Sequence, residues 1–229
     1  MTKEICEENG VKADMDGFQK CMEEQKERAR AARGDIESFH KQSKDLLEFK
    51  TPSEFVYDQE SLKAKVTGLF VDGNAVEEIE EEGDVAFDLT PFYAEMGGQV
   101  SDTGTVKNDS VLGTITRVGK APAGQHLHHV HLQFGHLSVG EEVELALDSK
   151  RRHLIERNHS ATHLLHAAIS EILGKHVEQK GSYCDENYLR FDFTSMDKLS
   201  SEDLNKIEAL VNEKIAESIP EETKILPVD

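Results

Sequence analysis

The sequence predicts an α+β fold in three successive parts: a short N-terminal helical arm at residues 1–50, a small antiparallel β-barrel at 51–147, and a sheet packed on two helices at 148–229. Two observations support this prediction. Apolar residues first recur at helical spacing, then fall into short β-prone runs between turn residues, and finally alternate between long helical and short extended stretches. Many short strands at close spacing are typical of a small barrel.

The arm is helical in pattern but thinly apolar. Residues 14–33 are rich in Glu, Lys, Gln, Arg and Ala, and the few apolar side chains include Phe18 and Met22. A second helical stretch at 36–49 ends before Pro52, which cannot continue a helix. Because so thin a stripe cannot bury a core, we expect the arm to end a larger domain or to pack on the next one.

The barrel is predicted from β-prone runs that are separated by turns such as Asp72-Gly73-Asn74. The acidic run at 77–82 is expected to be a solvated strand end or loop. Alternation along a strand places His126 and His128 on one face and two further histidines on the other, so we expect surface histidines and no metal site. The expected strands are 55–57, 66–71, 85–89, 103–107, 111–118, 128–134 and 142–147.

The third part begins with a long helix at 149–173, for which Gly174 is a plausible stop. Two strands at 176–181 and 188–193 follow, and in the second Arg190 and Asp192 alternate with apolar residues, so we expect an ion pair or hydrogen bonds there, with contact to RNA as the less favoured alternative. Ser200 resembles an N-terminal cap. The remaining elements expected are a helix at 201–218 and a strand at 224–228.

Composition excludes several classes of protein. The 229 residues carry a net charge of −19, which opposes DNA binding and any nucleic-acid contact spread over the whole surface. No apolar run is long enough to span a membrane, and the N-terminus is not a signal peptide. The three cysteines form no CxxC pair, which favours a reducing, cytoplasmic setting. Basic residues gather around the 149–173 helix, where a neutral or basic surface is expected: Lys150, Arg151, Arg152, Arg157, Lys175, Lys180 and Arg190.

His159 and His163 are the most informative pair in the chain. Four residues advance a helix by roughly 400°, so the two side chains lie about 40° apart on one face and can reach one metal ion, most plausibly zinc. The alternative is a helix face that binds no metal. A metalloprotease helix has Glu directly after the first His, whereas this chain has Ser160, so peptide hydrolysis of that type is disfavoured.

Four stretches together resemble alanyl-tRNA synthetase, and they cover nearly the whole chain in the order of that family. The strongest is the sequence LTPFYAEMGGQVSDTG, which is similar to the glycine-rich editing motif of the family. The second is the histidine helix, the third is HVEQKGS followed by LRFDF, and the fourth is similar to the segment before the editing domain. In this chain they occupy residues 89–104, 159–166, 176–193 and 17–32.

The resemblance implies a domain that hydrolyses the ester in alanine tRNA that carries serine or glycine. An alanine pocket cannot sterically exclude glycine and rejects an added hydroxyl poorly, so a second, hydrolytic site is needed. By resemblance, His159 and His163 match two of four zinc ligands, and Gln179 matches a glutamine that lines the editing pocket. Gly97, Gly98 and Gln99 match the loop that lies near the tRNA terminus. The implied partners are the tRNA acceptor end and the rest of the synthetase chain.

The sequence departs from the family in two respects. The Cys-x-x-x-His segment that would supply the other zinc ligands does not follow Val228, and Cys184 is a poor substitute, so the zinc site is expected to be incomplete. No ATP-binding motif occurs, so ATP and aminoacylation are expected only in a parent protein. Three functions stay open: the editing hydrolase, a non-catalytic module that positions the acceptor end, and a free-standing trans-editing deacylase, which residues 17–32 disfavour.

Overall fold

The computed structural model describes residues 17–18, 20–22, 43–174, 176–195 and 198–220. The chain separates into two compact units, Met1–Gln42 and Ser43–Asp229. In the first unit the described residues are helical, as expected for part of the 14–33 stretch. In the second unit, α3 (Lys44–Glu48) is the described part of the second predicted helix. The strand expected at 224–228 lies outside the described residues.

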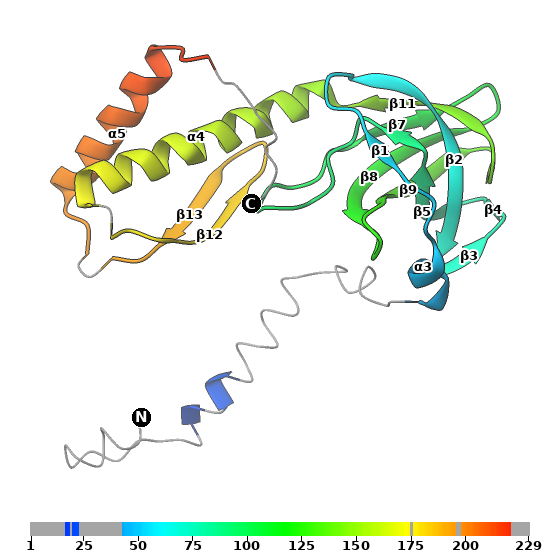
Figure 1. The fold of residues 1–229 in the computed structure, drawn as a ribbon, viewed down its shortest axis with the longest axis horizontal. Helices are drawn as coiled ribbons and strands as arrows, with labels where there is room; N and C mark the ends of the chain where they lie inside the picture. Colours follow the sequence, from blue (N-terminus) through cyan, green and yellow to red (C-terminus); the bar gives the residue numbers. More distant parts are fainter. Residues whose placement is uncertain (1–16, 19, 23–42, 175, 196–197, 221–229) are drawn as a thin grey trace, which may run out of the picture. The chain divides into compact units, whose positions relative to one another are not determined.

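Antiparallel strands form a closed barrel within the described part of the second unit (Figure 1). Pairing of β11 with β2 closes it, and β3 extends one edge. In order round the barrel the strands are β2 (Ser61–Val71), β5 (Glu82–Phe87), β9 (His126–Phe134), β8 (Leu112–Lys120), β7 (Gly104–Lys107) and β11 (Glu142–Leu147). The shorter strands are β3 (Asn74–Val76), β1 (Glu54–Phe55) paired with β6 (Leu89–Thr90), and β4 (Glu78–Ile79) paired with β10 (Leu137–Ser138).

Alternation of side chains fills the barrel. Along β8 and β9 the inward residues are fully buried, and Ile115 pairs directly with Val130 across the two strands. Burying these aliphatic side chains supplies most of the favourable free energy of folding in this region, at about 1.5–3 kcal/mol for each fully buried one. The predicted α+β fold and barrel are therefore confirmed. The acidic run 77–82 lies on exposed strand ends, with only Ile79 buried among its glutamates.

The histidines of β9 correct one prediction. His128 is completely buried, with Nε2 2.7 Å from Thr90 Oγ1 and Nδ1 3.0 Å from the Val85 carbonyl oxygen. His126 is also buried and stacks on Phe55, so the expectation of surface residues was wrong for both. The shared face was predicted, but that face is the interior of a closed barrel. Burial lowers the pKa of His128 to about 3 and that of His126 to about 4, so both are neutral at pH 7.

The rest of the second unit, here called the helical layer, consists of α4 (Ser149–Leu173), a hairpin and α5 (Ser201–Ala216). The hairpin is β12 (Gln179–Cys184) with β13 (Leu189–Phe193), and it and α5 both lie along α4 (Figure 1). The bounds of α4 and its end at Gly174, which has a φ of 106°, match the prediction. No helix in the described ranges is long and apolar enough to cross a membrane.

Strand β12 runs from Gln179 to Cys184, so it begins and ends three residues later than the predicted 176–181 strand. The later end depends on contacts outside the hairpin. Cys184 N–H donates to the Gly98 carbonyl at 2.8 Å, and Val100 N–H donates to the Cys184 carbonyl at 3.1 Å, so the glycine-rich loop holds the end of β12 as a strand. The predicted ion pair on β13 is confirmed, with Arg190 Nε 3.2 Å from Asp192 Oδ2.

Candidate functional site

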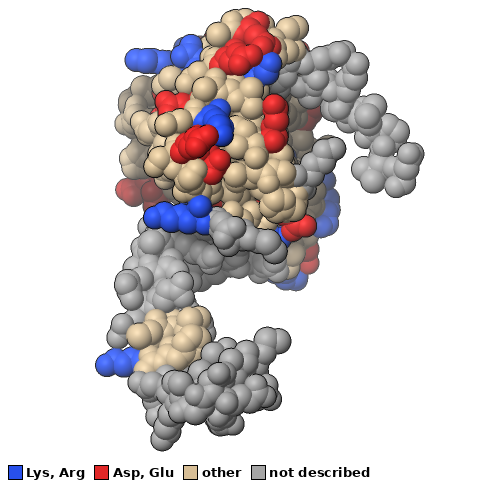
Figure 2. Space-filling model, turned by 90° about the vertical axis from the view of Figure 1, so that its left-hand side faces the viewer, with Lys and Arg blue, Asp and Glu red and all other residues tan. Residues whose placement is uncertain are grey.

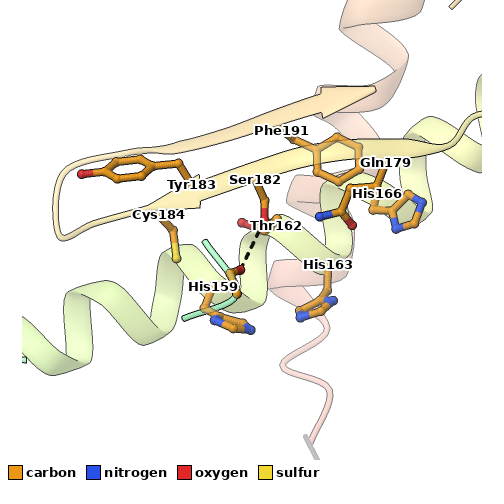
Figure 3. Close-up of a pocket in the computed structure, with 10 residues that line it drawn as sticks. His159, Thr162, His163, His166, Gln179, Ser182, Tyr183, Cys184 and Phe191 are labelled. Atoms are coloured by element: carbon orange, nitrogen blue, oxygen red, sulfur yellow. Dashed lines mark hydrogen bonds between the residues drawn. The ribbon is translucent and has the colours of Figure 1, made fainter. Parts of the chain in front are cut away.

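The two helical histidines lie side by side on α4, as their spacing predicts. The ring centroids of His159 and His163 are 5.1 Å apart, with the ring planes inclined by 39°. Both rings project from the same side of the helix (Figure 3). His163 is exposed and His159 is half-buried, so an ion could reach both rings from solvent.

The glycine-rich loop reaches this helix through Gln99. Its side chain is buried, and its Oε1 lies 2.6 Å from Nδ1 of His159. Because a carbonyl oxygen only accepts hydrogen bonds, Nδ1 carries the proton and Nε2 carries the lone pair that a metal would need. Metal-bound histidines usually donate their other ring N–H to such an acceptor. The Gln99 contact therefore gives His159 the tautomer and orientation of a metal ligand.

Glycine is required where this loop touches the hairpin. Gly98 has a φ of 84°, and a Cβ there would collide with the backbone carbonyl of Ser182. Gly97 has a φ of 63° but faces open space, so only its backbone conformation favours glycine. The hydroxyl of Ser182 donates to the Gly97 carbonyl at 3.5 Å, which is the dashed contact in Figure 3. The loop is thus fixed to both α4 and β12.

A small cavity of about 90 Å³ lies where the loop, α4 and the hairpin meet. His159, His163 and His166 line it from α4, and Gln179 lines it from the start of β12 (Figure 3). His166 packs on Phe191, with ring centroids 5.1 Å apart. The other lining residues are Gly97, Thr162, Ser182, Tyr183, Cys184 and Phe191. The structure thus brings Gln179, Gly97 and the two histidines to one cavity.

Sequence reasoning missed the ion pair that anchors this assembly. Arg152 was expected on a basic surface, but it is buried, and its Nε lies 2.9 Å and 3.0 Å from the two carboxylate oxygens of Asp102. It also donates to the Pro91 carbonyl at 2.9 Å, while the Tyr93 N–H donates to Asp102 at 2.7 Å. Asp102 is the acidic residue of the glycine-rich motif. The sequence offered one signal of this ion pair, which is the presence of an acidic residue within a motif that otherwise resembles a loop.

Cys184 lines the cavity as well, and burial is the main cause that raises its thiol pKa, so the thiol is neutral at pH 7. Zinc prefers nitrogen and sulfur donors, and the two imidazoles together with the outer hydrogen bond of His159 fit that ion. Among the described residues no group of three or more His, Cys, Asp or Glu is placed to hold a metal ion. The two predicted ligands, His159 and His163, therefore do not belong to such a group.

Surface charge near the site is mixed. On the face shown in Figure 2, Lys and Arg side chains are interspersed with Asp and Glu and do not gather into one basic patch. Arg151 pairs with Glu186 at 3.1 Å, and its Nη1 donates to the Ser101 carbonyl at 2.7 Å. Lys150 and Arg157 are exposed on α4. The basic residues that remain on this surface are therefore accompanied by acidic ones, and Arg152 is not among them because it is buried.

Comparison with known proteins gives a consistent result. Residues 1–151 match the family described as tRNA synthetases class II (A). The chain is 41% identical to an alanine–tRNA ligase of Geobacillus thermodenitrificans and 43% identical to that of Lactobacillus johnsonii, with 100% of the chain and 26% of each relative aligned. The alanine–tRNA ligase of Bacillus anthracis is 44% identical, over 96% of the chain and 25% of the relative. The chain thus spans about a quarter of the length of these relatives.

Proposed function

We propose, because the chain belongs to the class II (A) tRNA synthetases and is similar to alanine–tRNA ligases along its length, that it carries out the editing reaction of such a ligase. The reaction is hydrolysis of the ester between tRNA for alanine and a wrongly attached serine or glycine. Its partners would be the tRNA acceptor end and the remainder of the ligase. Aminoacylation with ATP is proposed only for a whole ligase, in the cytoplasm.

The observation that carries this proposal is the cavity between loop, helix and hairpin. Its volume of about 90 Å³ corresponds to roughly six to nine water molecules, since about 10–15 Å³ is needed to hold a single water. A small amino acid fits such a volume, whereas a large side chain does not. Gln179, Thr162 and Ser182 give the lining polar groups that can hydrogen-bond an amino group or a hydroxyl. A site that hydrogen-bonds a substrate hydroxyl discriminates against an analogue that lacks it, so these groups can favour serine over alanine.

His159 and His163 would hold a zinc ion at the mouth of this cavity. When bound, zinc can polarise an ester carbonyl or lower the pKa of a water molecule. The role of Gln99 is to fix the ring of His159 through their 2.6 Å hydrogen bond. Gly98 lets the loop approach Ser182 closely, and this contact defines one wall of the cavity. The chain's own residues therefore bind and orient the substrate amino acid.

The test is the rate of deacylation of seryl-tRNA for alanine by the full chain with added zinc. We expect faster loss of serine than of correctly attached alanine, and we expect His163→Ala to reduce the rate to the uncatalysed background. His153→Ala is the matched control, because His153 is an exposed histidine of the same helix that pairs with Glu60 and does not line the cavity. It should leave the rate unchanged.

Two results would count against the hydrolase. The first is an unchanged rate in His163→Ala, and the second is no hydrolysis by the unaltered chain above background. The second result would favour the module that positions the acceptor end without cutting the ester. A free-standing deacylase is disfavoured by the match of residues 1–151 to the synthetase family, which includes the 17–32 stretch.

A further inference from the structure

A second and larger hollow adjoins the small cavity. It has a volume of about 600 Å³ and lies where α4 meets the barrel and its glycine-rich loop. We call it the tyrosine groove, and its lining residues include Tyr57, Tyr93, Gln99, Arg152, Glu156 and His159. The proposed deacylation chemistry uses only the His159 and Gln99 edge of this groove, so most of its surface has no assigned role.

The tyrosine groove and the small cavity share His159, which lines both. The hydrogen bond from His159 to Gln99 therefore joins a residue common to both hollows to a residue of the groove. The groove, at about 600 Å³, is larger than the cavity, at about 90 Å³. In an aminoacyl nucleoside, likewise, the nucleoside is larger than the small amino acid attached to it. A hollow of several hundred Å³ is large enough to enclose most of a molecule of nucleoside size. The ester that joins the two parts would then lie beside His159.

The aromatic wall of the groove is preformed. Phe55 makes edge contacts with both tyrosines, and its ring centroid is 6.0 Å from that of Tyr57 and 6.3 Å from that of Tyr93. Tyr57 remains 64% exposed despite this support, so one face of its ring is open to a ligand. Exposed aromatic rings held in this way are the usual stacking platforms for unpaired bases at nucleic-acid ends.

The charges in the groove favour a nucleoside over a polyphosphate. Arg152 is already satisfied by Asp102 and by the Pro91 carbonyl, so it offers little to a further anion. Glu156 lies 3.8 Å from Arg152 Nη1, and its side chain is 41% exposed. A carboxylate accepts hydrogen bonds from ribose hydroxyls or an exocyclic amine but repels phosphate. A free nucleotide with several phosphates is therefore a poor occupant.

We infer that the tyrosine groove binds the 3′-terminal nucleoside of the tRNA acceptor end. The base stacks on Tyr57, the ribose lies toward Glu156, and the attached amino acid passes His159 into the small cavity. This inference rests on the proposed function for the identity of the RNA. It adds a binding site for the nucleoside, which the resemblance to the family does not supply.

The test measures binding by fluorescence anisotropy and does not depend on hydrolysis. The probes are two labelled RNA hairpins with the acceptor-stem sequence, one with a complete 3′ CCA end and one without the terminal adenosine. We expect the full chain to bind the complete hairpin at least about fivefold more tightly, which is the lower limit for stacking of one base. Tyr57→Ala should abolish this difference, and Tyr57→Phe should retain it.

Phe134→Ala is the matched control, because Phe134 is similarly exposed, at 68%, and lies on β9 away from the groove lining. It should keep the preference for the complete hairpin. Equal binding of the two hairpins would overturn the inference, as would an unchanged preference in Tyr57→Ala. Binding of free AMP as tightly as the complete hairpin would also overturn it, because the groove would then be a free-nucleotide site.

Failure of this inference differs from failure of the proposed function. If seryl-tRNA is not hydrolysed but the terminal adenosine still strengthens binding through Tyr57, only the hydrolase proposal is lost. If hydrolysis depends on His163 while neither the terminal adenosine nor Tyr57 affects affinity, only the tyrosine groove is lost.

Discussion

The barrel and the helical layer bury their apolar residues to very different extents. The barrel encloses a continuous cluster in which Val85, Val130 and Leu145 are completely inaccessible to solvent. In the described part of the helical layer, the buried cluster consists of Ala168, Ile169, Val177 and Ile207, surrounded by half-buried side chains. The candidate metal ligands and most of the cavity lining belong to the layer that is less well packed. Binding and catalytic elements commonly come from the less stable part of a protein.

Polar contacts with the barrel compensate for this difference. Arg152 pairs with Asp102, Arg151 Nη1 donates to the Ser101 carbonyl, and Asp148 N–H donates to the Thr103 carbonyl at 2.8 Å. All three acceptors lie in or next to the glycine-rich motif. The motif therefore has two structural tasks, since it shapes the cavity and attaches α4 to the barrel.

The largest loss of stability is expected when the ion pair that attaches α4 to the barrel is removed. Arg152→Ala leaves the Asp102 carboxylate buried without its partner, and such changes typically cost about 3–5 kcal/mol of unfolding free energy. Urea denaturation measures the loss. Lys206→Ala, which breaks an exposed pair with Glu202, serves as a control and should leave stability unchanged.

The double variant Arg152→Ala with Asp102→Ala sharpens this test. It should lose less stability than the sum of the single variants, because removing both groups leaves no unpaired charge. Strict additivity of the two losses would show that the ion pair does not couple helix and barrel.

The next effect compares the two cores directly. Leu145→Ala, at a fully buried barrel position, should cost about 3 kcal/mol, whereas Leu210→Ala, at a half-buried position of α5, should cost about 1 kcal/mol. Hydrogen exchange should show faster opening across all barrel strands in the first variant and only in the helical layer in the second. Equal losses and equal exchange patterns would mean that the two regions unfold as one unit.

The sequence predicts the barrel better than the site because strand alternation is a local signal. Runs and turns alone predict a strand at β2, β5, β7, β8, β9 and β11 and the full length of α4, but they do not predict the short strands β3, β4 and β10. Contacts between residues that are distant in the sequence cannot be predicted from these local patterns. Gln99 and His159 are 60 positions apart, and their contact depends on how the loop crosses α4. The roles of these residues in catalysis remain predictions.

Burial of polar residues was the least predictable property. Alternation placed His126 and His128 on a common face, but only barrel closure makes that face an interior. Arg152 is adjacent to two other basic residues and has the local pattern of a solvated helix start. Its burial follows from the approach of Asp102, which belongs to another element. In both cases the burial depends on contacts between elements that are distant in the sequence, and local patterns do not show these contacts.

The third effect tests whether acid weakens the barrel. The folded pKa of His128 is about 3, below its ordinary value of 6.5, so the unfolded state binds more protons between these values. Stability is therefore expected to fall as pH falls through this window, by about 2 kcal/mol between pH 6.5 and 5. His129 opposes part of this loss, because its hydrogen bond with Asp84 raises its pKa.

Urea denaturation at several pH values measures this dependence, with His128→Gln as the comparison. The variant should be less stable at pH 7, because Gln cannot reproduce both hydrogen bonds, but its stability should depend less on pH. An unchanged pH dependence would assign the acid sensitivity to other groups, of which His126 is the first to test, since its pKa of about 4 has the same sign.

The smallest effect concerns a single helix cap in the helical layer. Ser200 accepts a hydrogen bond from the Asp203 N–H at 3.1 Å, and the Asp203 carboxylate accepts one from the Ser200 N–H at 3.2 Å, which completes a capping box. Ser200→Ala should cost about 1 kcal/mol. Hydrogen exchange should show this loss in α5, while exchange in β5 and β9 stays unchanged. Matching acceleration in those barrel strands would contradict the difference between the two regions, because it would require that α5 and the barrel open together.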